Sequence, residues 1–462
     1  MLKNVRPIWL VIAGIILFRL VTLSLYPLMD STEARYGEIA RIMIETNNWV
    51  TPQFDYNVPF WGKPPLHTWA SAAFGKVMGI SEFSLRLPHL LSSLVTLFVL
   101  GLFARRLNLS VPLVVLISCS TVGIFVASGM IMTDSLLLMS MTMAMVGFAI
   151  AWRDGSSAYA YLGFIGIGLG LLAKGPIILI LLGLAIVPWI VFNYGFLKGL
   201  KELFSRIPLV SGLLLTCLIA LPWYIMAERA TPGFLNYFLV GEHFLRFVQS
   251  GWQGDLYGSA HSRPRGIIWI YWIIIAFPWS FYLAAKLFSK ESRATLKKQS
   301  DTDNLTSYFV FWLISPMLLF TMSGNILPIY VLPGIPAIAF LIARMAPKGN
   351  MTVMLTSLIT PIAMLVYMLV ALPSLSNNKS DKALLADTEQ QYPLYYLGER
   401  SFSGRFYSQG KAKLIDSLDD IKNVQGPFYL AVNHYIKLDS LWAKRCDMIA
   451  QNHKRHLMLC SN

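Results

Sequence analysis

The chain has 462 residues, of which 55% are hydrophobic and 13% are charged, and its formal net charge is +14. Because ordinary soluble domains carry roughly 25% charged residues, this composition excludes a wholly soluble globular protein and indicates an integral membrane protein with a modest polar appendage. In a membrane protein, Lys and Arg mainly keep loops on the cytoplasmic side of the membrane. They can also attract anionic lipid head groups. No basic stretch resembles a nucleic-acid module, so no nucleic-acid partner is expected.

Eleven apolar segments approach the roughly 20 residues that a helix needs to cross a bilayer. They are residues 7–28, 84–104, 110–129, 133–152, 158–173, 176–194, 208–227, 266–288, 305–322, 328–345 and 351–372. The first follows Lys3 and Arg6 and lacks a small-residue cleavage site, so we interpret it as an uncleaved span. The expected fold is an α-helical polytopic membrane domain of about eleven helices over residues 1–372.

Basic residues occupy every alternate short loop, which places those loops and the N-terminus in the cytoplasm. The loops contain Arg105 and Arg106, then Arg153, then Lys198, Lys201 and Arg206, then five cations between Lys286 and Lys298, and finally Arg344 and Lys348. Two long loops, residues 29–83 and 228–265, therefore lie on the outer side together with the polar tail.

The first outer loop carries two amphipathic patterns. Residues 31–46 alternate apolar positions with polar Glu33, Arg35, Glu38 and Arg41, and residues 64–78 are rich in aromatics and alanine. Both patterns predict helices that lie at the membrane interface.

The tail, residues 373–462, predicts a small extracytoplasmic α/β domain. Residues 426–436 have strand character, and the preceding SLDDIK stretch is typical of a capped helix start. Cys446 and Cys460 lie in this tail and are expected either to form a disulfide, if it is extracytoplasmic, or to stay unpaired.

Ionisable residues at the outer ends of the spans are the candidates for chemistry. Asp30 follows the first span, where a charge near the bilayer is costly and therefore a functional candidate; the alternative is that it caps the next helix. Lys63 precedes two prolines that stiffen its backbone, which suits a phosphate ligand, whereas the alternative is a lysine snorkelling to the interface.

Further candidates lie in later segments. Asp134 and Lys174 stand at the outer ends of apolar spans, Glu242, His243 and Arg246 fall on neighbouring helical turns, and Tyr330 lies between two prolines. No nucleotide-binding loop, serine-hydrolase motif or local metal-ligand spacing is present. Cations suited to phosphate thus lie only on the outer side, which favours a substrate whose phosphate is carried by a lipid.

An ordered set of motifs over roughly residues 1–345 resembles a known family. DSTEARYGEIARIM, KPPLHTW, MTDSLL, LAKGP, EHFLRF and SGNILPIYVLPGIPA follow one another as in bacterial GT-C glycosyltransferases. That group includes the aminoarabinose transferases that modify lipid A and, more distantly, the protein O-mannosyltransferases. The resemblance implies transfer of a sugar from an undecaprenyl-phosphate (polyprenyl-phosphate) donor to lipid A, lipopolysaccharide or another envelope glycan at the periplasmic face of a bacterial inner membrane.

The resemblance also implies residue roles. Asp30 and Asp134 would be catalytic, in an inverting single displacement. The substrate- and phosphate-binding residues would be Glu33, Arg35, Tyr36, Lys63, Lys174, His243, Arg246 and Tyr330.

Two positions depart from the family pattern. Gly62 replaces a glutamate that can bind a divalent metal together with the equivalent of His243, so we assign no metal, and Asn325 replaces a common lysine. These departures leave the sugar and any metal open, and the sequence does not specify the acceptor. The alternatives are a protein O-glycosyltransferase, a non-catalytic envelope assembly protein, and a lipid-linked sugar transporter, which would predict two related halves that the sequence does not show.

Overall fold

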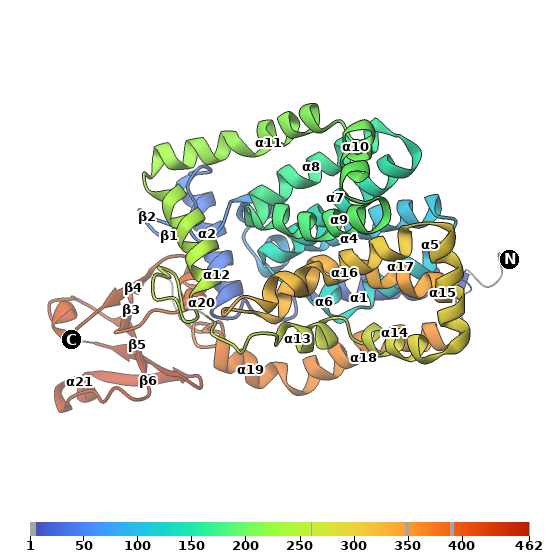
Figure 1. The fold of residues 1–462 in the computed structure, drawn as a ribbon. Helices are drawn as coiled ribbons and strands as arrows, with labels where there is room; N and C mark the ends of the chain where they lie inside the picture. Colours follow the sequence, from blue (N-terminus) through green and yellow to red (C-terminus); the bar gives the residue numbers. More distant parts are fainter. Residues whose placement is uncertain (1–5, 260, 347–350, 389–391, 462) are drawn as a thin grey trace.

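A computed structural model describes residues 6–259, 261–346, 351–388 and 392–461. It comprises a helical membrane domain with a small sheet domain at one end (Figure 1). The membrane domain contains α1 (Arg6–Thr22), α4 (Glu82–Arg106), α5 (Val111–Cys119), α6 (Val122–Ala127), α7 (Thr133–Asp154), α8 (Ser157–Lys174), α9 (Ile177–Tyr194), α10 (Phe196–Arg206), α11 (Leu209–Ala230), α13 (Ile268–Ile275), α14 (Trp279–Phe288), α15 (Lys290–Thr302), α16 (Leu305–Thr321), the 3-10 helix η3 (Pro328–Gly334), α17 (Pro336–Met345), α18 (Met351–Val370) and α19 (Leu372–Lys379).

Every predicted span coincides with one helix or with two consecutive helices. Among the residues that the structure describes, six helices are long and apolar enough to cross a membrane unbroken, and three further pairs qualify only when joined across bends of 100°, 108° and 54°. The predicted span 110–129 breaks between α5 and α6, where the hydroxyls of Ser120 and Thr121 donate back to the carbonyls of Leu116 and Ile117. The number of spans therefore remains a prediction.

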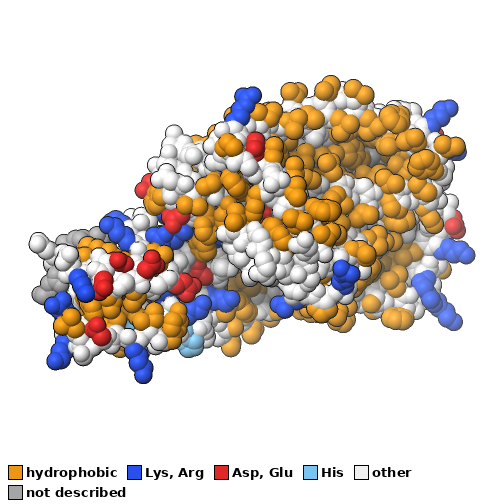
Figure 2. All heavy atoms as spheres, turned by 60° about the vertical axis from the view of Figure 1, so that its left-hand side comes forward, with side chains coloured by type: hydrophobic (Ala, Val, Ile, Leu, Met, Phe, Trp, Pro, Cys, Tyr) orange, Lys and Arg blue, Asp and Glu red, His pale blue; other side chains and the backbone are white. Residues whose placement is uncertain are grey.

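Apolar side chains cover the outside of the helical domain, as expected of an integral membrane protein. Figure 2 shows them spread over the face of this domain, whereas charged side chains gather on the sheet domain and at the edges. Phe192 on α9 and Leu218 on α11 are each 73% exposed. Lipid hydrocarbon is the environment that accepts such a surface.

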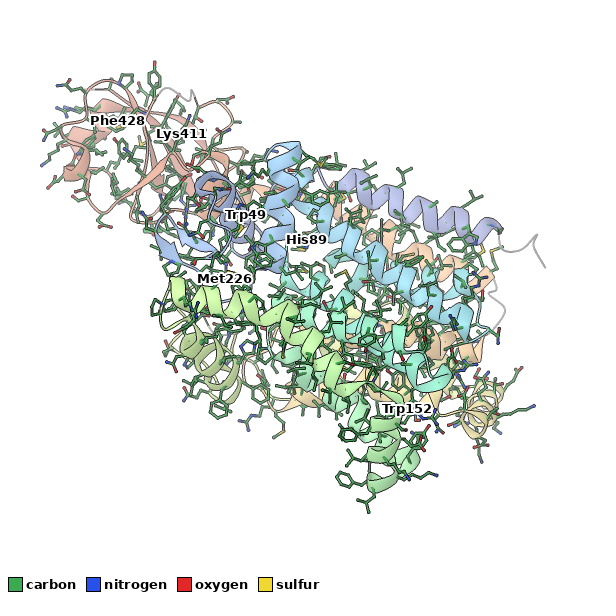
Figure 3. The ribbon with its side chains drawn as sticks, turned by 90° about the horizontal axis from the view of Figure 1, so that it is seen from above. Trp49, His89, Trp152, Met226, Lys411 and Phe428 are labelled. Atoms are coloured by element: carbon green, nitrogen blue, oxygen red, sulfur yellow. A yellow bond between two sulfur atoms is a disulfide. The ribbon has the colours of Figure 1, made fainter. Side chains whose placement is uncertain are left out.

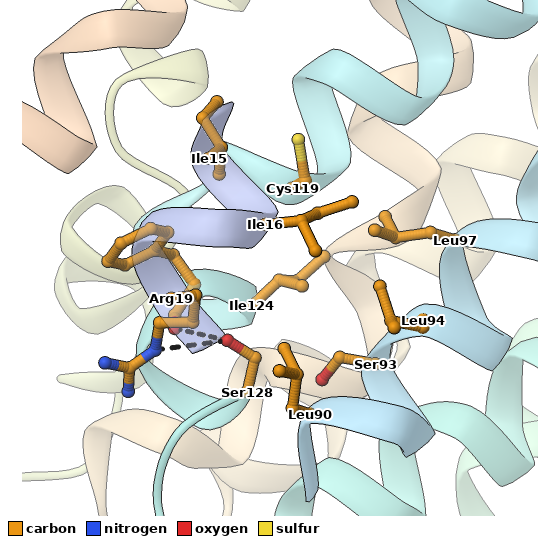
Figure 4. A pocket seen from close by; sticks show the side chains of 11 residues that line it. Ile15, Ile16, Arg19, Leu90, Ser93, Leu94, Leu97, Cys119, Ile124 and Ser128 are labelled. Atoms are coloured by element: carbon orange, nitrogen blue, oxygen red, sulfur yellow. Dashed lines mark hydrogen bonds between the residues drawn. The ribbon is translucent and has the colours of Figure 1, made fainter. Parts of the chain in front are cut away.

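One buried cation inside the membrane domain was not predicted. Arg19 of α1 is 2% exposed and donates to Ser128 (Figure 4). It also donates to Thr22, Tyr26 and the carbonyl of Val126. Within the described part of the chain it has no carboxylate partner. Its hydrogen bonds tie α1 to the segment between α6 and α7, which leads into Asp134. A lone arginine in an apolar run was the signal in the sequence.

The first outer loop folds into α2 (Thr32–Thr46), the hairpin β1 (Gln53–Asp55) and β2 (Val58–Pro59), and α3 (Leu66–Met78). The second outer loop contains the π-helix η2 (Asn236–Leu245), which continues directly into α12 (Arg246–Val248). Both loops lie at the end of the membrane domain that adjoins the sheet domain (Figure 1).

The tail forms a five-stranded sheet of order β4-β3-β5-β7-β6, parallel over the first three strands and antiparallel over the rest. Its elements are β3 (Leu394–Leu397), α20 (Phe402–Tyr407), β4 (Ala412–Ile415), the 3-10 helix η4 (Leu418–Ile421), β5 (Phe428–Asn433), α21 (Ser440–Arg445), β6 (Cys446–Gln451) and β7 (Arg455–Cys460). The predicted strand is β5, and Ser417 caps η4 as the SLDDIK pattern predicts. Cys446 and Cys460 form a disulfide across β6 and β7.

The sheet domain docks on the first outer loop, and this changes the environment expected for α2. Helix α2 packs against α3, β1 and α20 rather than lying at an open interface. Glu38 and Arg41 are 0% and 3% exposed, and Arg405 of α20 contacts Glu38 at 3.6 Å. The expected interfacial position of α2 is therefore wrong, because its polar face is buried in ion pairs with a domain distant in sequence.

Candidate functional site

Four chain segments bring charged side chains together beside the sheet domain. Lys63 precedes α3, Asp134 lies in the first turn of α7, and Lys174 ends α8. Glu242 and Arg246 come from η2 and α12, and Asp255 follows in the same outer loop. We call these six residues the charged cluster.

Glu242 joins the two outer loops through ion pairs. Its carboxylate accepts from Lys63 Nζ at 2.8 Å and from Arg246 Nη1 at 2.9 Å, and the same Arg246 nitrogen lies 3.1 Å from Asp255 Oδ2. Burial alone would raise the pKa of the Glu242 carboxyl, but Lys63 and Arg246 outweigh it and hold the pKa at about 2. Glu242 is therefore ionised at any physiological pH.

A second ion pair lies at the ends of α7 and α8. Lys174 Nζ donates to Asp134 Oδ1 at 2.5 Å and lies 4.5 Å from the centroid of the Tyr330 ring. Asp134 and Lys174 are 7% and 8% exposed. Lys174 also interacts electrostatically with Lys63 and Arg246, so the two ion-pair groups share one site.

His243 connects the segment that carries Glu242 with the end of α8 that carries Lys174, through contacts with backbone carbonyls. One ring nitrogen faces the carbonyl oxygen of Phe238 at 2.8 Å and the other faces that of Lys174 at 3.2 Å. Burial lowers the pKa of His243 below its usual value, against the opposite effect of the two carbonyls that its nitrogens face. The histidine thus fixes η2 against the end of α8.

Arg35 and Tyr36 extend the site from α2. Arg35 donates to the carbonyl of Tyr257 at 2.5 Å, and its Nε is buried without a partner among the described residues. Tyr36 packs edge-on against His67, with ring centroids 4.6 Å apart.

Asp30 and Glu33 lie in other environments. The Asp30 carboxylate accepts from the backbone N–H and the hydroxyl of Ser403, and its own N–H donates to the carbonyl of Lys379. Glu33 accepts both Nε and Nη2 of buried Arg86, at 2.8 and 2.9 Å. The structure therefore does not bring Asp30 into the charged cluster, and its carboxylate does not cap α2, whose N-cap Ser31 makes no side-chain cap either.

This placement yields a prediction for Asp30. We expect Asp30→Asn and Ser403→Ala to lower the free energy of unfolding by similar amounts, about 1–3 kcal/mol, because each leaves a buried polar group unpaired. Thermal unfolding in detergent, with sugar transfer measured in parallel, checks this. Loss of transfer in Asp30→Asn alone, with unchanged stability, would instead support the catalytic role that the resemblance implies.

The residues around position 62 do not fit a metal centre. A Cβ on Gly62 would lie 3.0 Å from the Phe60 ring and 3.2 Å from the Tyr257 ring, so aromatic side chains fill the space of the family's glutamate. Both nitrogens of His243 face backbone carbonyls, and the described residues hold no group of three or more His, Cys, Asp or Glu that could bind a metal.

Three contributing residues were not among the predicted site residues. Glu242 was noticed only for its helical spacing, Asp255 gave no signal, and Asn325 was noticed only as a departure. The Asn325 amide donates at 2.6 Å to the carbonyls of Arg246 and Gln249 and accepts from Gly251. It thereby fixes the backbone that carries Arg246.

The cluster retains donors for an anion. Arg246 makes its carboxylate contacts through Nη1, and the described residues offer no acceptor to its Nε or Nη2. The Tyr330 hydroxyl likewise makes no hydrogen bond to a described residue, and Lys63 is partly exposed. A guanidinium, an ammonium and a phenol from these neighbouring segments form a donor set suited to a phosphate group.

Comparisons with known proteins identify the family of the chain. A family model described as dolichyl-phosphate-mannose-protein mannosyltransferase matches residues 7–238. The chain is 30% identical over 340 residues to a protein of Erwinia tasmaniensis, and 28% identical over 333 residues to one of Yersinia pestis. Both are named undecaprenyl phosphate-alpha-4-amino-4-deoxy-L-arabinose arabinosyl transferase.

These matches cover 71% and 69% of the chain, but 57% and 55% of the relatives, so the chain spans little more than half their length. The fold resembles crystal structures of ArnT from Cupriavidus metallidurans. The TM-score is 0.75 against the form bound to undecaprenyl phosphate and 0.74 against the apo form, at 18% identity. The two alignments cover 97% and 99% of this chain, and 97% and 98% of those chains.

Proposed function

Because the chain belongs to the dolichyl-phosphate-mannose-protein mannosyltransferase family, we propose that it is an inverting glycosyltransferase that uses a polyprenyl-phosphate-linked sugar. The observation that carries the proposal is the charged cluster with its free donors. Lys174 ends the apolar helix α8, and Lys63 and Arg246 come from the two outer loops beside that end, which is the level at which a lipid-borne phosphate lies.

The proposed reaction is a single displacement. An acceptor oxygen attacks the anomeric carbon, the bond from that carbon to the carrier phosphate breaks, and the phosphate leaves with the electron pair. Arg246 and Lys63, with a hydrogen bond from Tyr330, stabilise the negative charge that grows on the departing phosphate. The membrane holds both lipids near the site, which lowers the entropic cost of their encounter.

We assign Asp134 as the general base that acts on the acceptor. It lies beside Tyr330 within the charged cluster, and Lys174 fixes its orientation at 2.5 Å. In this role Asp134 accepts the proton of the attacking oxygen. Asp30 is the second candidate base, and it requires release from Ser403 to reach an acceptor.

The acceptor that we propose is lipid A or another lipid-linked envelope glycan. The named relatives support a lipid-linked aminosugar donor, whereas the family model is described by a protein acceptor, so protein O-glycosylation is the second candidate. The positive-inside pattern supports a bacterial inner-membrane location with the N-terminus cytoplasmic and the cluster and sheet domain periplasmic.

Mass spectrometry of lipid A, core oligosaccharide and envelope proteins tests the proposal. We expect one added sugar on one of these classes in the wild-type strain, its absence after deletion, and its return with the wild-type gene but not with Asp134→Asn. An identical glycan profile in all three classes in the wild-type and deletion strains contradicts the proposed function.

A further inference from the structure

An apolar cavity runs along α9 from Leu179 to Trp189, towards the end of the membrane domain that the charged cluster does not occupy. Its volume is about 220 Å³. Helices α7, α8, α9, α11 and α16 and the region of α10 line it, and it opens to the apolar surface, where Val187 and Leu213 are 55% and 50% exposed. Its lining is apolar and includes Trp152, Trp189, Gly183, Leu203 and Ile207. Figure 3 shows Trp152 at the end of the molecule away from the sheet domain that carries Phe428 and Lys411.

Helix topology supports this placement. Helix α7 begins with Asp134 at the charged cluster and ends near Trp152, and α9 runs in the same direction. Helix α9 ends directly before α10, so α10 lies at the end that the cluster does not occupy. Such a cavity stays dry in water, whereas in a bilayer hydrocarbon can fill it.

Helix α10 borders the cavity and has two different faces. Leu203 and the following Ile207 line the cavity, while Phe196, Leu197 and Phe204 are 67%, 80% and 64% exposed. The other face carries Lys198 and Lys201, both exposed. This combination is typical of a helix that lies in the plane of the membrane surface among anionic head groups.

Close packing fixes α10 over the cavity. Gly199 approaches α9 so closely that a Cβ there would lie 2.3 Å from Cγ2 of Ile190. Arg206 donates to the carbonyl of Trp152 at 2.7 Å, and its guanidinium lies 5.7 Å from the centroid of that ring. A cation is thus held against a side chain that lines the cavity.

We propose that this place binds an anionic phospholipid, with one acyl chain in the cavity and the head-group phosphate on Lys198, Lys201 and Arg206. The occupant follows from the lining, which is apolar, and from the charge on α10. Lys198 and Lys201 make no ion pair with a described residue, and Arg206 pairs with the acid Glu202 at 2.7 Å through Nε, which leaves a net positive charge at the border. The site is separate from the charged cluster and does not depend on the proposed transfer activity.

Native mass spectrometry of the full chain in detergent tests the site. The probes are palmitoyl-oleoyl phosphatidylglycerol and phosphatidylcholine with the same chains. We expect phosphatidylglycerol to bind on the order of tenfold more tightly, since each basic residue near an anionic head group contributes several-fold. Lys198→Gln combined with Lys201→Gln removes this preference.

A variant that fills the cavity provides a second test of the proposed lipid site. A Cβ at Gly183 meets no atom within 4 Å, so Gly183→Leu can enter the cavity without a clash at Cβ. We expect it to weaken phosphatidylglycerol binding about tenfold. Gly14→Leu is the matched control, because Gly14 on α1 has equally open space and is not part of the cavity.

Three outcomes overturn the proposal. The first is equal binding of both phospholipids, and the second is unchanged phosphatidylglycerol binding in Gly183→Leu. The third is a change in the binding of undecaprenyl phosphate alone in Gly183→Leu, which would assign the cavity to the carrier's tail. Transfer activity is recorded for each variant, so that a failed lipid site is distinguished from a failed enzyme.

Discussion

Lys63→Gln is expected to lower the rate of sugar transfer by about 10²–10³-fold. The substitution removes a cation that stabilises charge on the departing phosphate, and the loss of one such preorganised donor has this typical effect. It also leaves the Glu242 carboxylate, whose side chain is 3% exposed, with Arg246 as its one remaining cation among the described residues and Tyr237 as a neutral donor. Initial rates over a range of donor concentrations measure the effect.

The double variant Lys63→Gln with Glu242→Gln separates the two consequences. It removes the unbalanced carboxylate while keeping the hydrogen-bonding shape, so stability returns towards wild type. If Lys63 acts on the phosphate, transfer stays low in the double variant. Recovery of transfer would show that Lys63 serves only to neutralise Glu242, and would remove it from the proposed mechanism.

Lys174→Met is expected to lower the free energy of unfolding by about 3–5 kcal/mol, because it leaves Asp134 charged, buried and unpaired. Asp134→Leu combined with Lys174→Met should recover most of that loss, since paired removal of a buried ion pair is often neutral. Thermal unfolding in detergent measures both.

Transfer in the double variant gives the functional readout. We expect the folded double variant to show no sugar transfer, because it lacks the Asp134 carboxylate that we assign as the general base. A folded double variant with wild-type transfer would reduce Asp134 and Lys174 to a structural pair. Arg106→Gln, which affects an exposed ion pair with Asp154 at the other end of α7, is the control and should change stability little.

The membrane helices could be predicted because their signal is local. About 20 apolar residues in sequence suffice to indicate a span, and all eleven predicted segments are helical. The bends could not be predicted from apolarity. At α5 and α6 they depend on single hydroxyls that bond back to the preceding turn.

The environment of the first outer loop could not be predicted, because its partners are remote. The spacing of polar and apolar residues along α2 is the same whether its polar face meets water or Arg405. Asp30 likewise looks like a free acid until Ser403 is placed beside it. By contrast, the Glu242–Arg246 pair is local, and its helical spacing predicted their proximity.

The docking of the sheet domain on α2 has a consequence for biosynthesis. Asp30 and Ser403 are 373 residues apart in the chain. At 5–20 residues per second, translation from one to the other takes roughly 20–75 s. Throughout that interval Asp30 and Asp55 lack Ser403, Arg400 and Arg405, which later pair with them, so this part of the nascent loop must remain hydrated or chaperoned. The end of this protein that carries the charged cluster is therefore completed last, although its first residues are among the earliest to leave the ribosome.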